Sequence, residues 1–305
     1  LHFNERHAYH DIYTYGSALV KDPGFYFGFM AHCGPQGLVS TEDAKNRRSL
    51  LGPMFSRRAV LELDFTVQLK VWHLAQKWFT SSDSGIQMAM AYRSITTDVI
   101  TEYCFAESAN TLTPGFDHPM KTQYEIDGLL KNPDSLSGTN HETIYHHLLN
   151  PKDQAPLSQK TLVDEAFTLV SAGSEAVGGV CTVGTFYALK NRTIYTYRKL
   201  LEELCKAWPD KDILMSYVAL EKFPYLVRDK QLGHFFLTFI KEALRFSIGV
   251  CHPLPRIVRA STEIGGYRIP SGVRIQMLYL AWCELYLIFG NIFRNFKMTL
   301  LDTGS

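Results

Sequence analysis

The stretch that decides the fold is Thr238–Val258, TFIKEALRFSIGVCHPLPRIV, which is soon followed by Gly265–Gly272, GGYRIPSG. Glu242 and Arg245 stand three positions apart, so on a helix they share one face and can pair. Such a pair alone says little, because many exposed helices carry one and it contributes little to stability. The order of a Glu-x-x-Arg helix, a Pro-Arg step and a Gly-x-x-Ile-Pro-x-Gly turn is far more specific.

Helical spacing dominates the rest of the chain. Residues 57–79 place apolar side chains on one helical face. Ser158–Leu189 is long, largely apolar and nearly free of charge in its second half, which predicts a helix that crosses the core. Further helices are expected at Phe235–Phe246 and Leu280–Phe296. Strand signal is confined to Ile264–Ile275, which alternates around a Pro-Ser-Gly turn and predicts a small hairpin. The expected fold class is mainly α with a minor β-hairpin region.

The composition is that of an ordinary folded protein. Hydrophobic residues make up 46% and charged residues 20% of the 305 residues. The formal net charge of +1 argues against a nucleic-acid partner. No internal repeat or low-complexity tract divides the chain, so we expect one domain over residues 1–305.

The cysteines and the hydropathy pattern point to an intracellular protein. Six cysteines lie far apart without a Cys-x-x-Cys pair, which argues against a zinc site and a secreted disulfide scaffold. The chain shows no signal-peptide pattern and no run of about eighteen apolar residues, so we expect no membrane anchor within it. His141, His146 and His147 lie close together, but their spacing matches no metal template, and no metal site is predicted.

Small residues interrupt the long apolar segment at Ala172-Gly173-Ser174-Glu175. Small side chains at the centre of a core helix leave room beside it for a flat ring. A carboxylate there is costly to bury without a partner or a wet cavity. The alternative interpretation is tight Gly/Ala helix packing with one solvated glutamate.

Together these motifs resemble the cytochrome P-450 family of haem-thiolate monooxygenases, and the resemblance covers nearly the whole chain. It is closest to fungal secondary-metabolism members such as trichodiene oxygenase-like enzymes. The resemblance implies a helical P-450-like domain, a haem cofactor, and insertion of one oxygen atom into an apolar small molecule. It also implies an NADPH-dependent reductase as partner and, for full-length relatives, attachment to the endoplasmic reticulum membrane.

The resemblance assigns roles to particular residues. Glu242 and Arg245 match the family's structural pair, which ties its helix to the loop that leads to the haem. Glu175 matches the acid of the proton relay, while Ala176 replaces the usual threonine, so the hydroxyl half of that relay is absent. Ala172-Gly173 matches the small pair beside the haem.

Two arginines match the family positions that grip the haem propionates. Arg48, in DAKNRRSLLGPMFSRR, lies four positions after Ala44, where many relatives carry His or Trp. Arg256 belongs to the Pro-Arg step. The planar guanidinium suits both to binding a carboxylate through two hydrogen bonds. The alternative for Arg48 is a solvated basic cluster with its arginine neighbours.

The chain departs from the family at its most important motif. The sequence contains no Phe-x-x-Gly-x-Arg-x-Cys-x-Gly loop. Counting back from Leu280-Ala281 puts the ligand cysteine at Ile275, and the hairpin is joined directly to the following helix. Cys283 lies at a different position and is interpreted as a packing thiol. The segment Val227–Leu237 reads as an insertion, and the region near Lys121–Gln123 is too short for the helices that cover the substrate cavity in the family.

Two hypotheses therefore stay open. The chain is a truncated monooxygenase by descent whose activity is impaired, or it is a non-enzymatic remnant or aberrant gene product that binds no haem. A helical interaction module has no positive support in the sequence. The nucleotide sequence between the codons for Met277 and Leu278 discriminates the first two, since an in-frame cysteine loop there would restore the enzyme.

Overall fold

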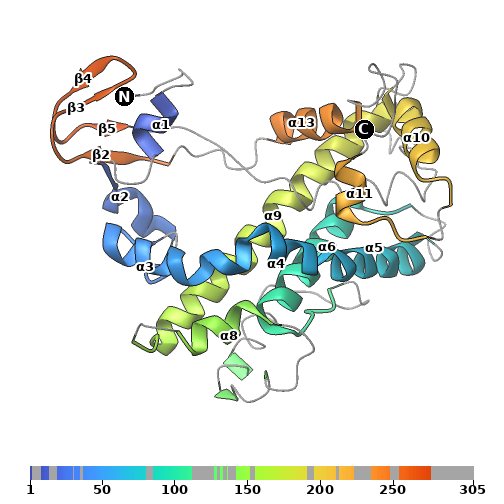
Figure 1. The fold of residues 1–305 in the computed structure, drawn as a ribbon, viewed down its shortest axis with the longest axis horizontal. Helices are drawn as coiled ribbons and strands as arrows, with labels where there is room; N and C mark the ends of the chain where they lie inside the picture. Colours follow the sequence, from blue (N-terminus) through green and yellow to red (C-terminus); the bar gives the residue numbers. More distant parts are fainter. Residues whose placement is uncertain are drawn as a thin grey trace.

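The computed structural model describes residues 1, 8–13, 19–29, 31–34, 37–79, 85–111, 127–128, 131–132, 136, 142–151, 155–190, 196–210, 213–222, 235–247 and 254–275. Helices form most of this part of the chain (Figure 1). The α-helices are α1 (Ala8–Tyr13), α2 (Pro23–Tyr26), α3 (Thr41–Leu51), α4 (Arg57–Glu62), α5 (Asp64–Phe79), α6 (Met88–Phe105), α8 (Ile144–Leu149), α9 (Gln159–Lys190), α10 (Thr196–Ala207), α11 (Tyr217–Glu221) and α13 (Phe235–Ser247). Two short 3₁₀ helices are η1 (Phe27–Phe29) and η2 (Gly52–Phe55).

The strands form two small antiparallel sheets. One has the order β1 (Leu19–Lys21), β2 (Arg256–Val258) and β5 (Arg274–Ile275), and the other pairs β3 (Thr262–Ile264) with β4 (Tyr267–Ile269). Strand β1, from near the start of the chain, pairs with β2 in a register that sets Lys21 opposite Arg256. The sheet therefore brings two basic residues from distant parts of the sequence together.

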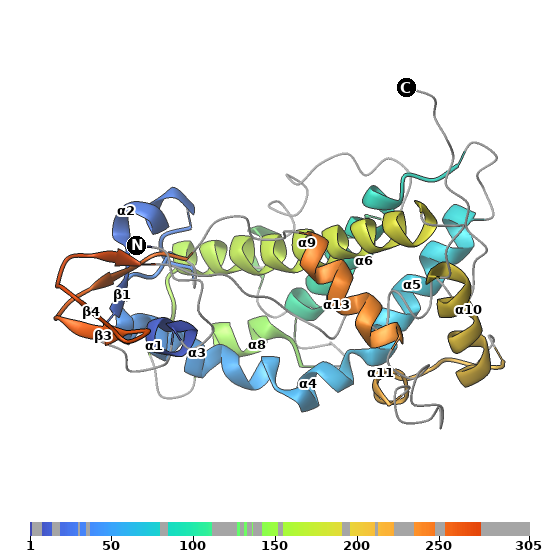
Figure 2. The same cartoon turned by 90° about the horizontal axis from the view of Figure 1, so that it is seen from above.

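Helix α9, like α6, contributes to both of the larger cores. Its first half contributes Leu162, Ala166 and Leu169 to a core shared with α3, α6 and α8. Its second half contributes Val177, Val180 and Cys181 to a core shared with α5, α6, α10, α11 and α13. Figure 2 shows α9 running through the middle of the molecule beside α6, with α13 packed against it.

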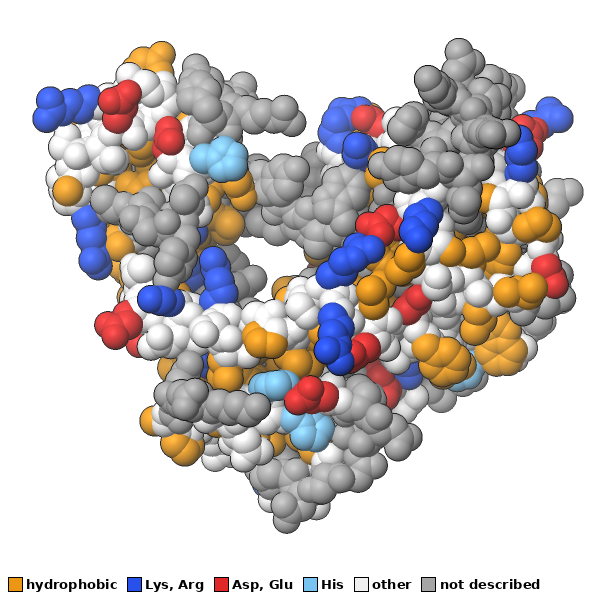
Figure 3. Space-filling view, in the orientation of Figure 1, with side chains coloured by type: hydrophobic (Ala, Val, Ile, Leu, Met, Phe, Trp, Pro, Cys, Tyr) orange, Lys and Arg blue, Asp and Glu red, His pale blue; other side chains and the backbone are white. Residues whose placement is uncertain are grey.

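The molecule has two lobes. The sheets, α1 and α2 form one lobe around their own small apolar core, and α5, α6, α10, α11 and α13 gather at the other end (Figure 1). The space-filling view shows the surface hollowed between the lobes (Figure 3). Helix α9 runs from the region of α3 and α8 to that of α10 and α13 (Figure 1).

The mainly helical class is confirmed, as is the long helix, which runs over Gln159–Lys190 instead of Ser158–Leu189. Residues 57–79 form two helices. The helix is interrupted at Leu63. Asp64 is the first residue of α5, and its carboxylate accepts the backbone N–H of Tyr217 at 2.8 Å. The expected helix at Leu280–Phe296 lies outside the described residues.

The expected hairpin was wrong in its turn. The β3–β4 hairpin turns at Gly265-Gly266, both with positive φ (60° and 81°), as a tight two-residue hairpin turn requires. The Pro270-Ser271-Gly272 turn instead carries the chain into the other sheet, where the Gly272 N–H donates to the Val258 carbonyl at 2.8 Å. Alternation alone does not say which strand each segment joins.

Helix α9 also differs from the expectation that no segment could span a membrane. It is long and apolar enough by length and composition, with a mean hydropathy of 1.3. A core helix meets the same criteria, and α9 is packed between α6 and α13.

Candidate functional site: a basic cavity between α3 and the sheet

A cavity of about 120 Å³ lies where α1, β1, α3 and β2 meet. Four of the residues that line it are cationic: Lys21, Lys45, Arg48 and Arg256. Its remaining lining is apolar or hydroxyl-bearing, and no aspartate or glutamate is among these residues. A cavity with several cations and no acid on its wall is suited to binding an anion such as a carboxylate.

Arg256 is held in place by aromatic side chains. Its Nη1 donates to the Tyr26 hydroxyl at 2.7 Å and to the backbone carbonyl of Pro255 at 3.2 Å. The guanidinium also lies over the ring of Tyr13, at 5.1 Å from the ring centroid. These contacts fix the arginine without neutralising it, so its charge stays available to a ligand.

The pKa of Lys21 reflects its buried and positively charged surroundings. Burial, and after it the positive charges of Arg256 and Arg48, together lower its pKa to about 8. Its ammonium lies 4.9 Å from the centroid of the Tyr26 ring. Like charges held together disfavour one another, so a bound anion would relieve their repulsion.

Helix α3 presents the other two cations. The Ser40 hydroxyl accepts the backbone N–H of Asp43 at 3.2 Å and caps its first turn. Lys45 and Arg48, three positions apart, reach the cavity from one side of the helix. No hydrogen bond or ion pair of the Arg48 side chain is found within the described part of the chain, and the residue is exposed. The structure thus brings Arg48 and Arg256, both predicted from the sequence, into one cavity.

Arg47, the neighbour of Arg48, is not part of a solvated cluster. Its Nη1 donates to Glu165 Oε1 on α9 at 2.6 Å, and the Glu165 side chain is 0% exposed. Burial raises the pKa of Glu165 to about 7, although the Arg47 charge opposes the shift. Sequence reasoning missed this pair because the two residues lie in segments with no pattern in common.

The predicted residues of α9 lie apart from the basic cavity. The Glu175 carboxylate pairs with Arg93 on α6 at 2.6 Å, and 59% of its side chain is exposed. Ala172 is exposed, but Gly173 faces α6, where an added Cβ would lie 2.6 Å from Ile100 Cγ1. The room that we expected beside this glycine is filled by α6. A contact of Ala172 and Gly173 with a cofactor stays a prediction.

The expected pair of Glu242 and Arg245 forms on α13. Arg245 Nη2 and Nε donate to Glu242 Oε2 at 2.6 and 2.9 Å. The exposed fraction is 61% for the Arg245 side chain and 50% for that of Glu242. The Arg245 guanidinium stacks on the Phe246 ring at 4.0 Å from its centroid. The pairing is confirmed, while its role in holding a haem loop stays a prediction.

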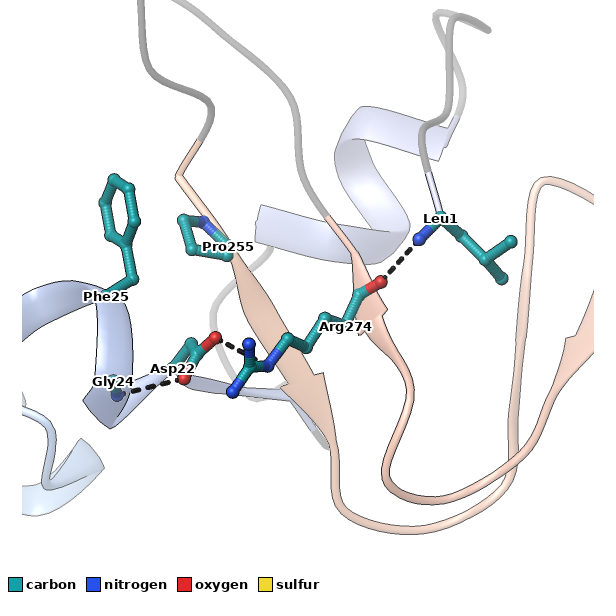
Figure 4. A pocket seen from close by; sticks show the side chains of 6 residues that line it. All are labelled: Leu1, Asp22, Gly24, Phe25, Pro255 and Arg274. Carbon is teal, nitrogen blue, oxygen red and sulfur yellow. Dashed lines mark hydrogen bonds and ion pairs between the residues drawn. The ribbon is translucent and has the colours of Figure 1, made fainter.

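A larger cavity, of about 410 Å³, is lined by Leu1, Asp22, Gly24, Phe25, Pro255 and Arg274 (Figure 4). Asp22 faces it, and its carboxylate accepts the Arg274 guanidinium at 2.8 Å and the Gly24 N–H at 3.0 Å. The Leu1 amino group donates to the Arg274 carbonyl at 2.8 Å. The two charged side chains of this cavity, Asp22 and Arg274, are therefore paired with each other.

The described cysteines do not reach the basic cavity. Cys104 and Cys181 are buried in the two large cores, Cys205 is exposed on α10, and Cys33 is half-buried. Burial raises the pKa of the Cys104 thiol. Cys251 and Cys283 lie outside the described residues. His146 caps α8, its Nδ1 accepting the Thr143 N–H at 3.0 Å, which accounts for one of the clustered histidines.

Comparison with known proteins gives a consistent result. The family model described as Cytochrome P450 matches residues 129–282, just over half of the chain. The chain is 23% identical to the cytochrome P450 monooxygenase flvC of Aspergillus flavus, over 98% of the chain and 71% of that protein. It is 27% identical to sdnE of Sordaria araneosa, over 92% of the chain and 64% of that protein. It is 24% identical to BOT1 of Botryotinia fuckeliana, over 100% of the chain and 77% of that protein.

These matches extend over more positions than the chain possesses. The match to BOT1 runs over 407 aligned positions, whereas the chain has 305 residues. Many aligned positions are therefore occupied only in the relative. The chain spans roughly two thirds of the length of the relatives it matches, between 64% and 77% for these three.

Proposed function

The chain belongs to the cytochrome P450 family, and on that premise we propose that it is a haem-thiolate monooxygenase by descent that is impaired in its reaction. The family activity is oxygen insertion into an apolar small molecule. The observation that carries the proposal is the basic cavity, which joins Arg48 and Arg256 from distant segments on a wall whose described residues include no acid. This chain keeps residues for the carboxylate end of a haem and lacks the loop for the iron end.

The carboxylate end fits a haem. When bound, haem supplies the iron chemistry of oxygen activation. Arg48 and Arg256 would hold its two propionates through charge-assisted hydrogen bonds, which are stronger than neutral ones. Lys21 and Lys45 would add positive charge at the same place.

The iron end does not fit. The sequence has no Phe-x-x-Gly-x-Arg-x-Cys-x-Gly loop, and the cysteines that the structure describes lie in apolar cores or away from the basic cavity. A thiolate ligand needs a cysteine that can lose its proton, which burial in an apolar core opposes. The proton relay is also incomplete, since Ala176 has no hydroxyl and Glu175 is engaged with Arg93.

The remaining functional expectations follow from the family. The substrate class is an apolar small molecule, and the electron donor is an NADPH-dependent reductase. Intact relatives are expected at the endoplasmic reticulum membrane and in fungal secondary metabolism. For this chain we propose the same substrate class, electron donor, location and metabolic role.

The second candidate function is a non-enzymatic remnant that binds no haem. Two features favour it: the missing cysteine loop and the pairing of Glu242 with Arg245 at an exposed surface. In this case the basic cavity is left over from the ancestral site. The two candidates differ in whether the chain takes up haem at all.

Titration with haemin tests the proposal. The purified chain should bind haemin, seen as a shift of the main haem absorption band. The reduced, carbon monoxide-bound form should lack the absorption band that a thiolate ligand produces. A thiolate band that disappears in Cys251→Ser or Cys283→Ser would overturn the proposed impairment. Absence of any haemin binding would overturn the first candidate in favour of the second.

Two variants locate the binding. Arg48→Gln and Arg256→Gln should each weaken haemin binding by about tenfold, the usual effect of losing a hydrogen bond to a charged group. Arg58→Gln is the matched control, because Arg58 is an exposed arginine that pairs with Glu62 on α4, away from the cavity. Equal affinities of all three variants would show that haemin binds elsewhere.

A further inference from the structure

We propose that the buried pair of Arg47 and Glu165 positions the basic cavity by fixing the rotation of α3 against α9. The proposal rests on the proposed function only in that its probe is haemin. Arg47 touches no ligand in this scheme. It acts through Arg48 and Lys45, the two cations that α3 presents to the cavity.

The pair is a buried polar link between the two helices. Arg47 Nη1 lies 2.6 Å from Glu165 Oε1, and both side chains are removed from solvent. Helix α3 also packs against η2 and α8. Glu165 Oε2 has no hydrogen-bond partner within the described part of the chain. The carboxylate is therefore committed to Arg47.

Helical geometry makes the rotation of α3 important. Neighbouring residues on an α-helix are about 100° apart around its axis. Arg47 points into the interior and Arg48 points to the cavity. If α3 turned about its axis, Arg48 and Lys45 would leave the cavity wall together. A directional bond at Arg47 holds the orientation that the apolar contacts of the helix do not by themselves specify.

Asp164, the residue before Glu165, bonds to the segment around Cys33, which precedes α3. Asp164 Oδ2 accepts the backbone N–H of Cys33 at 2.9 Å. The chain approaches α9 so closely here that a Cβ on Gly34 would lie 2.6 Å from the hydroxyl oxygen of Thr168. Two consecutive acids of α9 thus fix both the segment that enters α3 and the helix itself.

The energetics agree with a positioning role. Burying an ion pair costs desolvation that its mutual attraction only partly repays, so such a pair is a weak source of net stability. Its advantage is geometric, because guanidinium and carboxylate bond in a restricted set of directions. Loss of this pair is therefore expected to affect ligand binding in the cavity more than the stability of the fold.

The experiment compares haemin with its dimethyl ester, which lacks free carboxylates. In the parent chain, haemin should bind more tightly than the ester. Glu165→Gln should weaken haemin binding by about tenfold and leave ester binding unchanged, which lowers the ratio of the two affinities. A merely structural role would weaken both ligands alike and would overturn the proposal.

The control is Glu221→Gln. This variant breaks another long-range Arg–Glu pair, between Arg57 and Glu221 at 2.6 Å, which is exposed and lies outside the cavity. Its affinity ratio should equal that of the parent. In the Arg48→Gln background, Glu165→Gln should lower the ratio less than in the parent, because only Lys45 of the two positioned cations is left.

Two further variants keep the test decisive if Glu165→Gln folds poorly. Arg47→Lys keeps the charge but shortens the reach, and should give an intermediate ratio. The exchanged pair, Arg47→Glu with Glu165→Arg, should restore part of it. A ratio that falls in Arg48→Gln but not in any variant of the pair overturns this inference and leaves the proposed function standing. No haemin binding by the parent overturns both.

Discussion

Glu203, on α10, should make the stability of this protein depend on pH. Its side chain is 2% exposed and lies among Leu200, Leu204 and Phe236 in the apolar core. One oxygen accepts the backbone N–H of Phe236 at 3.1 Å, near the start of α13. Oε1 has no hydrogen bond within the described residues. Burial raises the pKa of this carboxyl to about 7, and the bond from Phe236 only partly offsets the shift.

The sign of the effect follows from this raised pKa. The native carboxyl holds its proton more tightly than the unfolded one, whose pKa is near the ordinary 4.5. Its favourable contribution is therefore full below about pH 4.5 and is lost as the pH rises to about 7 and beyond. Between about pH 5 and about pH 8 the loss amounts to about 2 to 3 kcal/mol.

Glu203→Gln removes this loss. The amide oxygen can still accept the Phe236 N–H, while the buried amide N–H₂ without a partner costs about 1 to 3 kcal/mol at every pH. The variant should therefore be less stable than the parent at acidic pH and should gain on it by about 2 to 3 kcal/mol towards about pH 8.

Urea unfolding followed by circular dichroism, at several pH values between these limits, measures the effect. Glu202→Gln is the matched control, because Glu202 is the exposed neighbour that pairs with Arg198 at 3.1 Å. It should keep the pH dependence of the parent. Parallel stability curves for Glu203→Gln and the parent would refute the reasoning, since they would mean that Glu203 ionises in the native core without cost.

Three further outcomes are expected. Gly173→Ala should destabilise the protein by about 1 to 3 kcal/mol in thermal unfolding, because the added Cβ would lie 2.6 Å from a side chain of α6. The control is Gly179→Ala, whose added Cβ meets open space. It should be neutral or stabilising by up to about 1 kcal/mol. Glu242→Ala should leave the unfolding midpoint close to that of the parent, and change it less than in an intact relative, because both members of the pair are exposed. Thiol labelling should modify the exposed Cys205 at once and the buried Cys104 only on unfolding, and rapid labelling of Cys104 would contradict the packing of its core.

Local patterns were sufficient for much of the fold. The period of apolar residues predicted α9 to within one residue at each end, because a helix that is buried on most of its surface must be apolar along its length. The spacing of Glu242 and Arg245 predicted their pairing for the same kind of reason, since residues three apart on a helix are neighbours whatever surrounds them. The missing cysteine loop is also a property of the sequence alone.

The sites that depend on distant segments needed the tertiary structure. Sequence similarity suggested Arg48 and Arg256 separately, but the pairing of β1 with β2 added Lys21 to them, and no local pattern predicts which strands pair. The same holds for Gly173. Its lack of a side chain was expected to leave room for a ligand, but α6 fills that space.

The two adjacent arginines of α3 show where the division lies. By local pattern alone Arg47 and Arg48 are equivalent members of a basic run on a helix, and only the family resemblance distinguishes Arg48. Their different fates, one in a buried pair with Glu165 and the other on the wall of a cavity, follow from how α3 is turned against α9. A chain's own periodicity determines that a helix forms, whereas the side chains it meets across the fold determine what each of its residues does.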